Sequence, residues 1–226
     1  MHVDLHFPVL GTLIPADHGY ELYARLSRLV PELHGDKYTL RIGPIRGTYT
    51  GNGVLQLVPN ISRLRLRLPA DAIPMVLPLA GQPLTIGGHE IRLGVPQVRS
   101  LIPAPILIAR MVVIKASSPR QDPAKKDSRD HAASKRYLDP GAFLEAVRHE
   151  LGRREISARA DLPNHETGPH AGQPRRHVMR IHGKTIVGFS VLVQELTAEE
   201  SVRLQEDGLG GRGKMGCGFF VVYLPR

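Results

Sequence analysis

Residues 20–37 contain a histidine, a lysine and two tyrosines whose side chains could act together on a phosphodiester. His34 follows a predicted helix that carries Tyr20 and Tyr23, and Lys37 comes shortly after it. A neutral imidazole can take a proton from a hydroxyl near pH 7, a lysine can stabilise charge that develops on phosphorus, and a tyrosine can orient either group. These residue types suit metal-free cleavage of RNA, in which a 2′-hydroxyl attacks the adjacent phosphate. From the residues alone, the alternative is a histidine that only interacts favourably with the helix dipole.

The segment GLGGRGKMGCG at residues 208–218 lies between a predicted helix and a hydrophobic strand. Closely spaced glycines permit positive φ angles and let backbone N–H groups approach an anion without a Cβ in the way. The residue order matches neither a Walker phosphate loop nor a GxGxxG motif that follows a strand. We therefore expect the segment to bind a phosphate backbone, and a purely structural turn is the alternative. The candidate contacts within it are Gly210, Gly211, Arg212, Gly213 and Lys214.

The charge balance also favours a polyanionic partner. The 226 residues include 30 Lys and Arg against 21 Asp and Glu, a formal net charge of +9, and basic side chains displace counterions from phosphates. In the segment ISRLRLRLP, the leucines would face one side of a strand and Arg63, Arg65 and Arg67 the other. Three guanidinium groups cannot all be buried without three partners, so we expect this face to meet water or a polyanion. The alternative is a charged face that resists aggregation.

The spacing of the histidines and the single cysteine does not match that of a metal site, and we expect neither a metal nor another cofactor. The 11 histidines form no HxxxH pair on a predicted helix and no HxH pair. The single cysteine, Cys217, excludes an internal disulfide and a four-thiolate zinc site, and it favours a reducing, cytoplasmic setting. We expect Cys217 to be a small buried filler. We expect neither a signal peptide nor a membrane span, because the apolar stretches fall short of the ~20 residues that a spanning helix needs.

The elements that would position these residues in the first half follow the order β-α-β-β-α-β, with extra strands at the end. Alternating apolar residues predict a half-buried strand over 3–9. Asp17 precedes a helix predicted over 18–33, which Pro31 disturbs and Gly35 ends. The other elements expected in this half are strands at 38–45, 54–58, 62–69, 83–87 and 89–95 and a helix at 70–79.

The second half repeats the same order of elements after a connection at 96–105. Thr197 and Glu200 have the spacing of a capping box for a helix that ends near residue 207. The other elements expected in this half are strands at 106–114, 176–182, 185–194 and 219–224, a helix at 139–151, a surface loop or disordered insertion at 117–137 and a loop at 161–174. We therefore predict an α+β fold of two tandem ferredoxin-like domains, at 1–100 and 101–226, with the glycine-rich loop at 208–218 in the second.

Three stretches of the chain resemble the CRISPR-associated repeat endoribonucleases of the RAMP superfamily, which process precursor CRISPR RNA in type I systems. They are LVPELHGDKYTLRIGPIRG (29–47), SRLRLRLPADAIPMVLPLAGQPLTIGGHEIRLG (62–94) and LTAEESVRLQEDGLGGRGKMGCGFF (196–220). The last of them contains the C-terminal glycine-rich loop that marks the superfamily. The resemblance covers most of the chain outside 117–137 and 160–174, and it too implies two ferredoxin-like domains.

The resemblance also implies an activity and the residues that perform it. The family cuts within CRISPR repeats without a metal and leaves a 2′,3′-cyclic phosphate and a 5′-hydroxyl. In many members the base is a histidine just after the first helix, often helped by a tyrosine on that helix and a lysine shortly after. His34, Lys37 and either Tyr23 or Tyr20 occupy these places. His18, at the start of the helix, is an alternative base.

In the family, RNA specificity usually comes from a hairpin or strand of the repeat, which suits recognition by shape and phosphates better than base stacking. The scarcity of aromatic residues (no Trp, 6 Tyr and 5 Phe) is consistent with this, and we expect the RNA to lie along the cleft between the two domains. The candidate contacts outside the glycine-rich loop are Arg148, Arg153, Arg154, Arg175 and Arg176. The expected partners are CRISPR repeat RNA, the processed guide RNA and other subunits of the type I interference complex, and no membrane. One alternative is a non-catalytic RNA-binding subunit of a CRISPR effector complex. A protein-interaction module without RNA is another, against which the charge argues.

Overall fold

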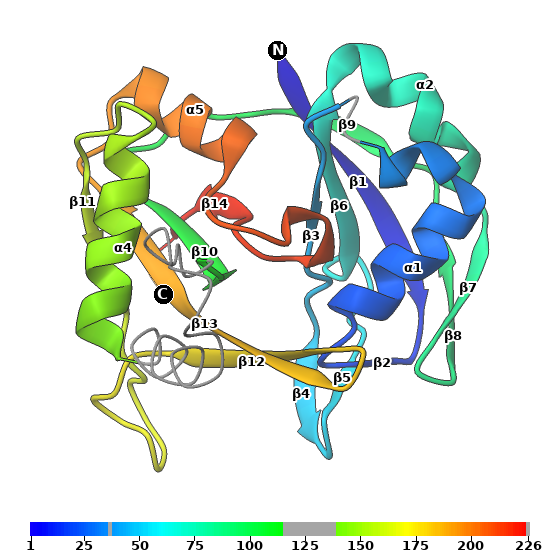
Figure 1. The fold of residues 1–226 in the computed structure, drawn as a ribbon. Helices are drawn as coiled ribbons and strands as arrows, with labels where there is room; N and C mark the ends of the chain where they lie inside the picture. Colours follow the sequence, from blue (N-terminus) through cyan, green and yellow to red (C-terminus); the bar gives the residue numbers. More distant parts are fainter. Residues whose placement is uncertain (36–37, 115–138, 225–226) are drawn as a thin grey trace, which may run out of the picture.

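The computed structural model describes residues 1–35, 38–114 and 139–224. These residues form two halves that lie side by side, each a curved antiparallel sheet covered by helices (Figure 1). Lys37 and the loop that we predict at 117–137 lie outside the described residues.

The sheet of the first half is centred on β1 (His2–Gly11), which pairs antiparallel with β6 (Arg63–Pro69) on one side and β9 (Gln97–Ser100) on the other. β6 also pairs with β3 (Arg41–Gly43), so the strands follow the order β9-β1-β6-β3. This is the strand order of a ferredoxin-like domain, with the fourth strand beside the first and the third between the first and the second. The helix α1 (Gly19–Leu29) packs its buried leucines into the core of this half.

Smaller elements complete the first half. A three-stranded sheet joins β2 (Leu13–Pro15), β5 (Val54–Gln56) and β4 (Thr48–Gly51) in that order. A hairpin of β7 and β8 pairs with the end of β1. The bounds of the hairpin and of the short helices are β7 (Pro83–Ile86), β8 (His89–Leu93), η1 (Pro31–His34), η2 (Ala70–Ala72), α2 (Ile73–Val76) and η3 (Leu77–Leu79).

The second half repeats the ferredoxin-like strand order. Its sheet follows the order β11-β13-β10-β14, and every pair is antiparallel. β12 extends this sheet as a long hairpin with β13, whose turn reaches the first half below α1 in Figure 1. The elements of this half are β10 (Leu107–Val112), α4 (Pro140–Gly152), β11 (Arg159–Asp161), β12 (Arg176–Ile181), β13 (Lys184–Gln194), α5 (Ala198–Asp207), η4 (Gly213–Met215) and β14 (Phe220–Val222).

Buried apolar side chains form one core in each half. The first core runs from Leu5 to Leu93 and the second from Leu107 to Phe220, so the domain boundary that we predict near residue 100 falls between them. A smaller cluster around Met111, Met179 and Cys217 packs against Tyr20 on α1 and Met215 in the glycine-rich loop. The apolar contact between the halves is therefore made largely by the β12–β13 hairpin and the glycine-rich loop.

The predicted α+β class and the tandem ferredoxin-like order are confirmed. The predicted elements differ from the observed ones at prolines and at a sheet edge. The helix predicted over 18–33 ends at Leu29, because Pro31 has no N–H to continue it and starts η1 instead. The helix predicted at 70–79 is a series of short turns that contains Pro74 and Pro78. Within the connection predicted at 96–105, residues 97–100 form the exposed edge strand β9. The predicted capping box of α5 is confirmed.

The prediction that the three arginines of β6 all meet water or a polyanion is wrong for Arg67, which is only 1% exposed. Its Nε and Nη2 donate to the two carboxylate oxygens of Asp4 at 2.7 and 2.8 Å. Its Nη1 donates to the backbone carbonyls of Gln205 and Phe220, at 2.9 and 2.7 Å. The guanidinium carbon also lies 4.3 Å from the ring centre of Phe219. Four of the five N–H donors of Arg67 thus have partners, and the side chain joins the strands of the first half to α5 and β14 of the second.

Replacing Asp4 by Asn should destabilise the protein by about 3–5 kcal/mol, because the buried Arg67 charge then has no counter-charge. Burial raises the pKa of Asp4, but hydrogen bonds from His6 and Arg67 and the charge of Arg67 outweigh this, so the pKa lies below its ordinary value of 3.8. A lowered pKa stabilises the fold above 3.8, and this stability is lost as the pH falls through the folded pKa. The difference from wild type, measured by urea unfolding, should therefore shrink in acid.

Glu90→Gln is the matched control for Asp4→Asn, because Glu90 is exposed on β8. This control should change the free energy of unfolding by less than about 0.5 kcal/mol. Equal unfolding midpoints for the Asp4 and Glu90 variants at pH 7 would contradict the role given to the Asp4–Arg67 pair.

Candidate active site

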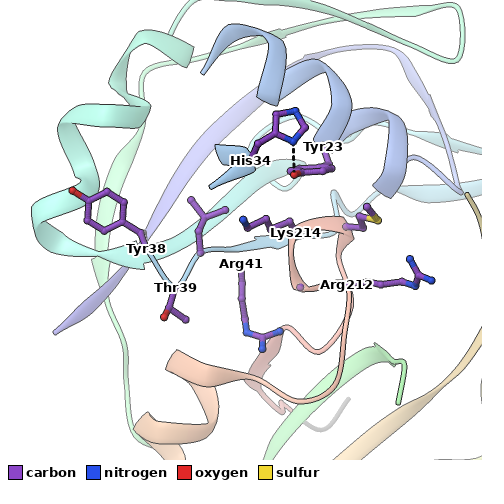
Figure 2. Close-up of a pocket in the computed structure, with 10 residues that line it drawn as sticks. Tyr23, His34, Tyr38, Thr39, Arg41, Arg212 and Lys214 are labelled. Atoms are coloured by element: carbon purple, nitrogen blue, oxygen red, sulfur yellow. Dashed lines mark hydrogen bonds between the residues drawn. The ribbon is translucent and has the colours of Figure 1, made fainter. Parts of the chain in front are cut away.

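A cavity of about 510 Å³ opens where α1, η1, β3 and the glycine-rich loop meet (Figure 2). It brings residues of the first half together with residues near the C-terminus. Its lining residues are Tyr23, His34, Tyr38, Thr39, Leu40, Arg41, Arg212, Gly213, Lys214 and Met215. The cavity therefore unites the candidate base with both charged side chains of the glycine-rich loop.

His34 is exposed and is held by Tyr23. Its Nδ1 lies 3.0 Å from the Tyr23 hydroxyl, and the two rings meet edge to face with their centres 5.4 Å apart. The break at Pro31 makes this contact possible, because the chain turns back as η1 and places His34 beside the helix that carries Tyr23. When Nδ1–H donates to the tyrosine oxygen, Nε2 is free to take a proton; when the tyrosine donates, Nε2 carries the hydrogen. The pair can therefore serve proton transfer in either direction.

Tyr20 lies at a different contact. Its hydroxyl is 2.8 Å from Nε2 of His182, in the turn between β12 and β13, and their ring centres are 4.9 Å apart. On the same hairpin, the backbone N–H of Arg180 donates to Asp17 at 2.8 Å. The structure thus brings Tyr23, and not Tyr20, to His34, and Tyr20 instead secures the hairpin to the start of α1.

His18 is only 2% exposed and has a backbone partner at each ring nitrogen. Nε2 accepts a hydrogen bond from the N–H of Ile45 at 3.0 Å, which leaves the proton on Nδ1 to donate to the carbonyl of Pro15 at 2.7 Å. Burial lowers the pKa of His18 and favours this neutral form. Because both nitrogens are used and the ring is buried, the geometry favours His34 over His18 as the base.

The glycines of the loop allow close packing against the rest of the second half and, at Gly213, against Arg41 of the first half. The N–H of Gly211 donates to the Val113 carbonyl at 2.8 Å, and the N–H of Gly218 donates to the Met111 carbonyl at 2.7 Å. A Cβ at Gly210 would collide with the Val113 carbonyl, and one at Gly213 would come within 2.6 Å of the Arg41 guanidinium. The expected phosphate contact through the N–H of Gly211 is therefore corrected, since that group is bonded within the protein. The charge that the loop offers to the cavity is carried by the side chains of Arg212 and Lys214.

Lys214 and Arg212 differ in how the loop holds them. The ammonium of Lys214 donates to the carbonyl of Gly35 at 2.7 Å, directly after His34 in the chain. The backbone of Arg212 has φ +65°, a left-handed conformation that residues other than glycine rarely adopt. In Figure 2 the Lys214 side chain lies between the His34–Tyr23 pair and Arg41.

Arg41 is a cavity residue that the sequence analysis missed. Burial, followed by the charge of Arg154, lowers its pKa to about 10, so it stays positively charged at neutral pH. Its Nη1 donates to the carbonyl of Cys217 at 3.4 Å, whereas its buried Nε has no hydrogen-bond partner in the described part of the chain. One feature of the sequence could have pointed to Arg41: it lies between the buried residues Leu40 and Ile42, on the strand that follows His34.

The arginines predicted to bind RNA outside the loop are distributed over the second half. Arg148 and Arg176 are exposed on α4 and β12. Arg153 and Arg154 both pair with Glu150, at 3.0 and 2.7 Å.

Arg175 pairs with Glu166 at 2.7 Å and lines a second cavity, of about 470 Å³, between the facing halves. Arg46, Arg65 and Arg110 line it too, together with His177, whose pKa burial and the nearby Arg110 lower to about 4. This basic cavity lies in the cleft where we expected RNA to bind.

Two negative observations concern metals and membranes. Within residues 1–35, 38–114 and 139–224, no group of three or more His, Cys, Asp or Glu side chains is arranged to hold a metal ion. None of the helices in these ranges has the length and apolar character needed to cross a bilayer.

Comparison with known proteins places both the sequence and the fold. The family model described as Cas6 Crispr matches residues 3–223. The CRISPR-associated endonuclease Cas6 of Myxococcus xanthus (strain DK1622) is 36% identical over 219 residues, which cover 97% of this chain and 80% of that protein.

Solved structures share the fold at low sequence identity. The product of a Cas6-related gene from Pyrococcus furiosus superimposes with a TM-score of 0.64 at 12% identity, over 100% of both chains. A structure described as an RAMP protein binding different RNA substrates gives a TM-score of 0.62 at 12% identity, over 96% of this chain and 98% of that one. These likenesses concern the fold alone.

Because we expect Arg212 to contact an RNA phosphate, replacing it by Gly should weaken binding to repeat RNA without destabilising the protein. Glycine relieves the left-handed backbone, which stabilises the fold by up to about 1 kcal/mol, while the loss of one phosphate contact lowers the slope of log affinity against log salt by about 1. Filter binding at several salt concentrations and thermal unfolding measure the two effects. Arg212→Ala is the matched control, which removes the same charge but keeps the strain. Wild-type affinity for RNA in the glycine variant would contradict the expected phosphate contact of Arg212.

Proposed function

Because this chain belongs to the Cas6 family of CRISPR proteins, we propose that it is an endoribonuclease that cuts precursor CRISPR RNA within its repeats. The proposal includes the chemistry, which is metal-independent transfer of the phosphate to the 2′-oxygen, and its products, a 2′,3′-cyclic phosphate and a 5′-hydroxyl. It also includes retention of the product as guide RNA in a type I interference complex with other subunits, in the cytoplasm.

The observation that carries the proposal is the pairing of an oriented histidine with cationic side chains in one open cavity. Tyr23 holds the ring of His34 at the cavity, and three cationic side chains, Arg41, Arg212 and Lys214, are among the other residues that line it. A base beside preorganised positive charge is what attack of a hydroxyl on a phosphodiester requires.

In the proposed reaction, the 2′-oxygen forms a bond to phosphorus as the bond from phosphorus to the 5′-oxygen breaks. Nε2 of His34 takes the proton of the 2′-hydroxyl, and this needs the tautomer in which Nδ1–H donates to the Tyr23 oxygen. The 5′-oxygen takes a proton from water as it leaves. Tyr23 is thus a positioning residue, which sets both the orientation and the tautomer of the base. A role for Lys37, the lysine expected from the family, stays a prediction.

The RNA path that we propose runs from this cavity across the basic cleft between the halves. The second cavity, lined by Arg65, Arg110 and Arg175, offers guanidinium groups to phosphates at a distance from the candidate base. The exposed Arg148 and Arg176 extend the positive surface over α4 and β12.

A non-catalytic RNA-binding subunit is the second candidate function, favoured by the exposure of His34. Such a protein would bind repeat RNA in a salt-dependent way and leave it uncut. The two candidates therefore differ only in whether the bound RNA is cleaved.

His34→Ala should bind labelled repeat RNA as the wild type does and cleave it about 10²–10⁴-fold more slowly, since it removes a general base. The measurement is single-turnover cleavage in EDTA, together with the equilibrium dissociation constant. His149→Ala, which changes an exposed histidine on α4, is the matched control and should cut at the wild-type rate.

The outcomes of the His34 experiment separate the candidates. If wild type binds but does not cut, the non-catalytic function replaces the proposed one. If wild type and the His34 variant cut equally in EDTA, the base has been assigned wrongly. Loss of wild-type cleavage in EDTA that returns with added Mg²⁺ would contradict the metal-independent chemistry.

Tyr23→Phe and Tyr20→Phe form a matched pair, because both remove one hydroxyl from α1. The structure predicts that Tyr23→Phe slows cleavage by roughly 10- to 100-fold through a misplaced His34 ring. Tyr20→Phe loses only the contact with His182 in the β12–β13 turn and should slow single-turnover cleavage far less. Equal losses, or a larger loss for Tyr20→Phe, would show that Tyr23 does not position the base.

A further inference from the structure

Lys214 reaches the candidate base from the opposite end of the chain. Its ammonium donates to the carbonyl of Gly35, the residue that follows His34, at 2.7 Å. Both side chains line the same cavity. An ammonium group can donate three hydrogen bonds, so the bond to Gly35 is compatible with another to a substrate oxygen.

The backbone that carries Lys214 is fixed by both halves of the protein. On the first half, the carbonyl of Met215 packs so closely on Gly19 that any Cβ there would collide with it. On the second half, the hydrogen bonds of Gly211 and Gly218 tie the loop to Val113, directly after β10, and to Met111 within it. The Lys214 side chain therefore starts from a preorganised position rather than from a free surface loop.

Preorganised positive charge has its largest effect where negative charge develops. In the proposed reaction, the non-bridging oxygens gain negative charge as the 2′-oxygen adds to phosphorus. A cation beside His34 is close to the 2′-oxygen from which the base removes the proton. The guanidinium of Arg41 donates to the backbone carbonyl of Cys217, whereas the Lys214 side chain extends along the cavity between Arg41 and the base (Figure 2).

We infer that Lys214 is a catalytic residue of the second half, whose ammonium contacts a non-bridging oxygen of the scissile phosphate and stabilises the charge of the transition state. This inference rests on the proposed function. It assigns to the glycine-rich loop a role in the chemical step in addition to RNA binding. Lys214 transfers no proton in this step, so the proton transfers remain those of His34 and water.

Removing the amine should slow the chemical step more than it weakens binding. We expect Lys214→Ala to lower the single-turnover rate at saturating protein by about 10²–10³-fold, the usual effect of losing one charge-stabilising donor. The dissociation constant for uncut repeat RNA should change by less than tenfold. Lys184→Ala, at the exposed first residue of β13, is the matched lysine control and should keep the wild-type rate at saturation.

An amine can be restored chemically at position 214 through an introduced cysteine, because the protein has only one cysteine of its own, Cys217, and it is buried. Lys214→Cys can be alkylated with 2-bromoethylamine, in which the thiolate displaces bromide and leaves a side chain that ends in an amine. Cys217 is fully buried, and burial raises its pKa to about 12, so the reagent should spare it. We expect alkylation of the folded Lys214→Cys variant to raise its single-turnover cleavage rate at least tenfold. The same treatment of Lys214→Ala should restore nothing, and equal rates before and after alkylation of the cysteine variant would overturn the inference.

A substrate with sulfur in place of the bridging 5′-oxygen separates charge stabilisation from proton donation, because a thiolate leaves without a proton. If Lys214 stabilises charge, Lys214→Ala stays slow on this substrate. Full recovery would show that Lys214 acts as an acid and would overturn the inference. A loss confined to the dissociation constant, or a rate loss in Lys37→Ala with none in Lys214→Ala, would overturn it as well.

These failures are distinct from failure of the proposed function. If wild type does not cut the repeat RNA at all, the endoribonuclease proposal fails together with the inference. If wild type cuts and His34→Ala does not, while Lys214→Ala cuts at the wild-type rate, the function stands and only the role of Lys214 is rejected.

Discussion

The arrangement of the two halves depends on one buried arginine. Arg67 donates two hydrogen bonds to Asp4 within the first sheet and two more to backbone carbonyls of Gln205 and Phe220 in the second half. A guanidinium group has five donors in a fixed plane, so it satisfies a carboxylate and two carbonyls at once only when all of them keep their relative positions. A buried charge with any of these partners missing is costly. This interaction therefore fixes the last helix and the last strand against the first sheet.

The candidate site is sensitive to this arrangement because it is composite. His34 and Tyr23 belong to the first half, whereas Arg212 and Lys214 lie on the short segment between α5 and β14. Arg67 bonds a residue of α5 and a residue of β14, so it holds both ends of that segment. A change of a few ångströms at the Arg67 interface would carry the cationic side chains away from the base.

The alternation of polar and apolar residues and the caps were sufficient to predict most elements, because these features depend on neighbours in the chain. Arg67 could not be predicted as buried, since its partners Gln205 and Phe220 come from the distant end of the sequence. Tyr20 and Tyr23 lie on one helix with nothing local to distinguish them. The rotation of α1 and the path of the chain after Pro31 decide which of them meets His34. The edge strand β9 was missed because its residues are exposed and its pairing with β1 is not local.

The composition of the glycine-rich loop follows from two different demands. At Gly210 and Gly218 a side chain would collide with the backbone carbonyls of Val113 and Leu209, so packing alone excludes larger residues there. Arg212 contradicts that trend, because it keeps a long side chain in a backbone conformation where glycine would cost less. Packing does not explain an arginine at that position, but a requirement for charge in the cavity does. The glycines set the path of the loop and the two cations bring charge to the cavity, so a pattern that reads from the sequence as a phosphate-binding backbone presents its charge in the structure through its side chains.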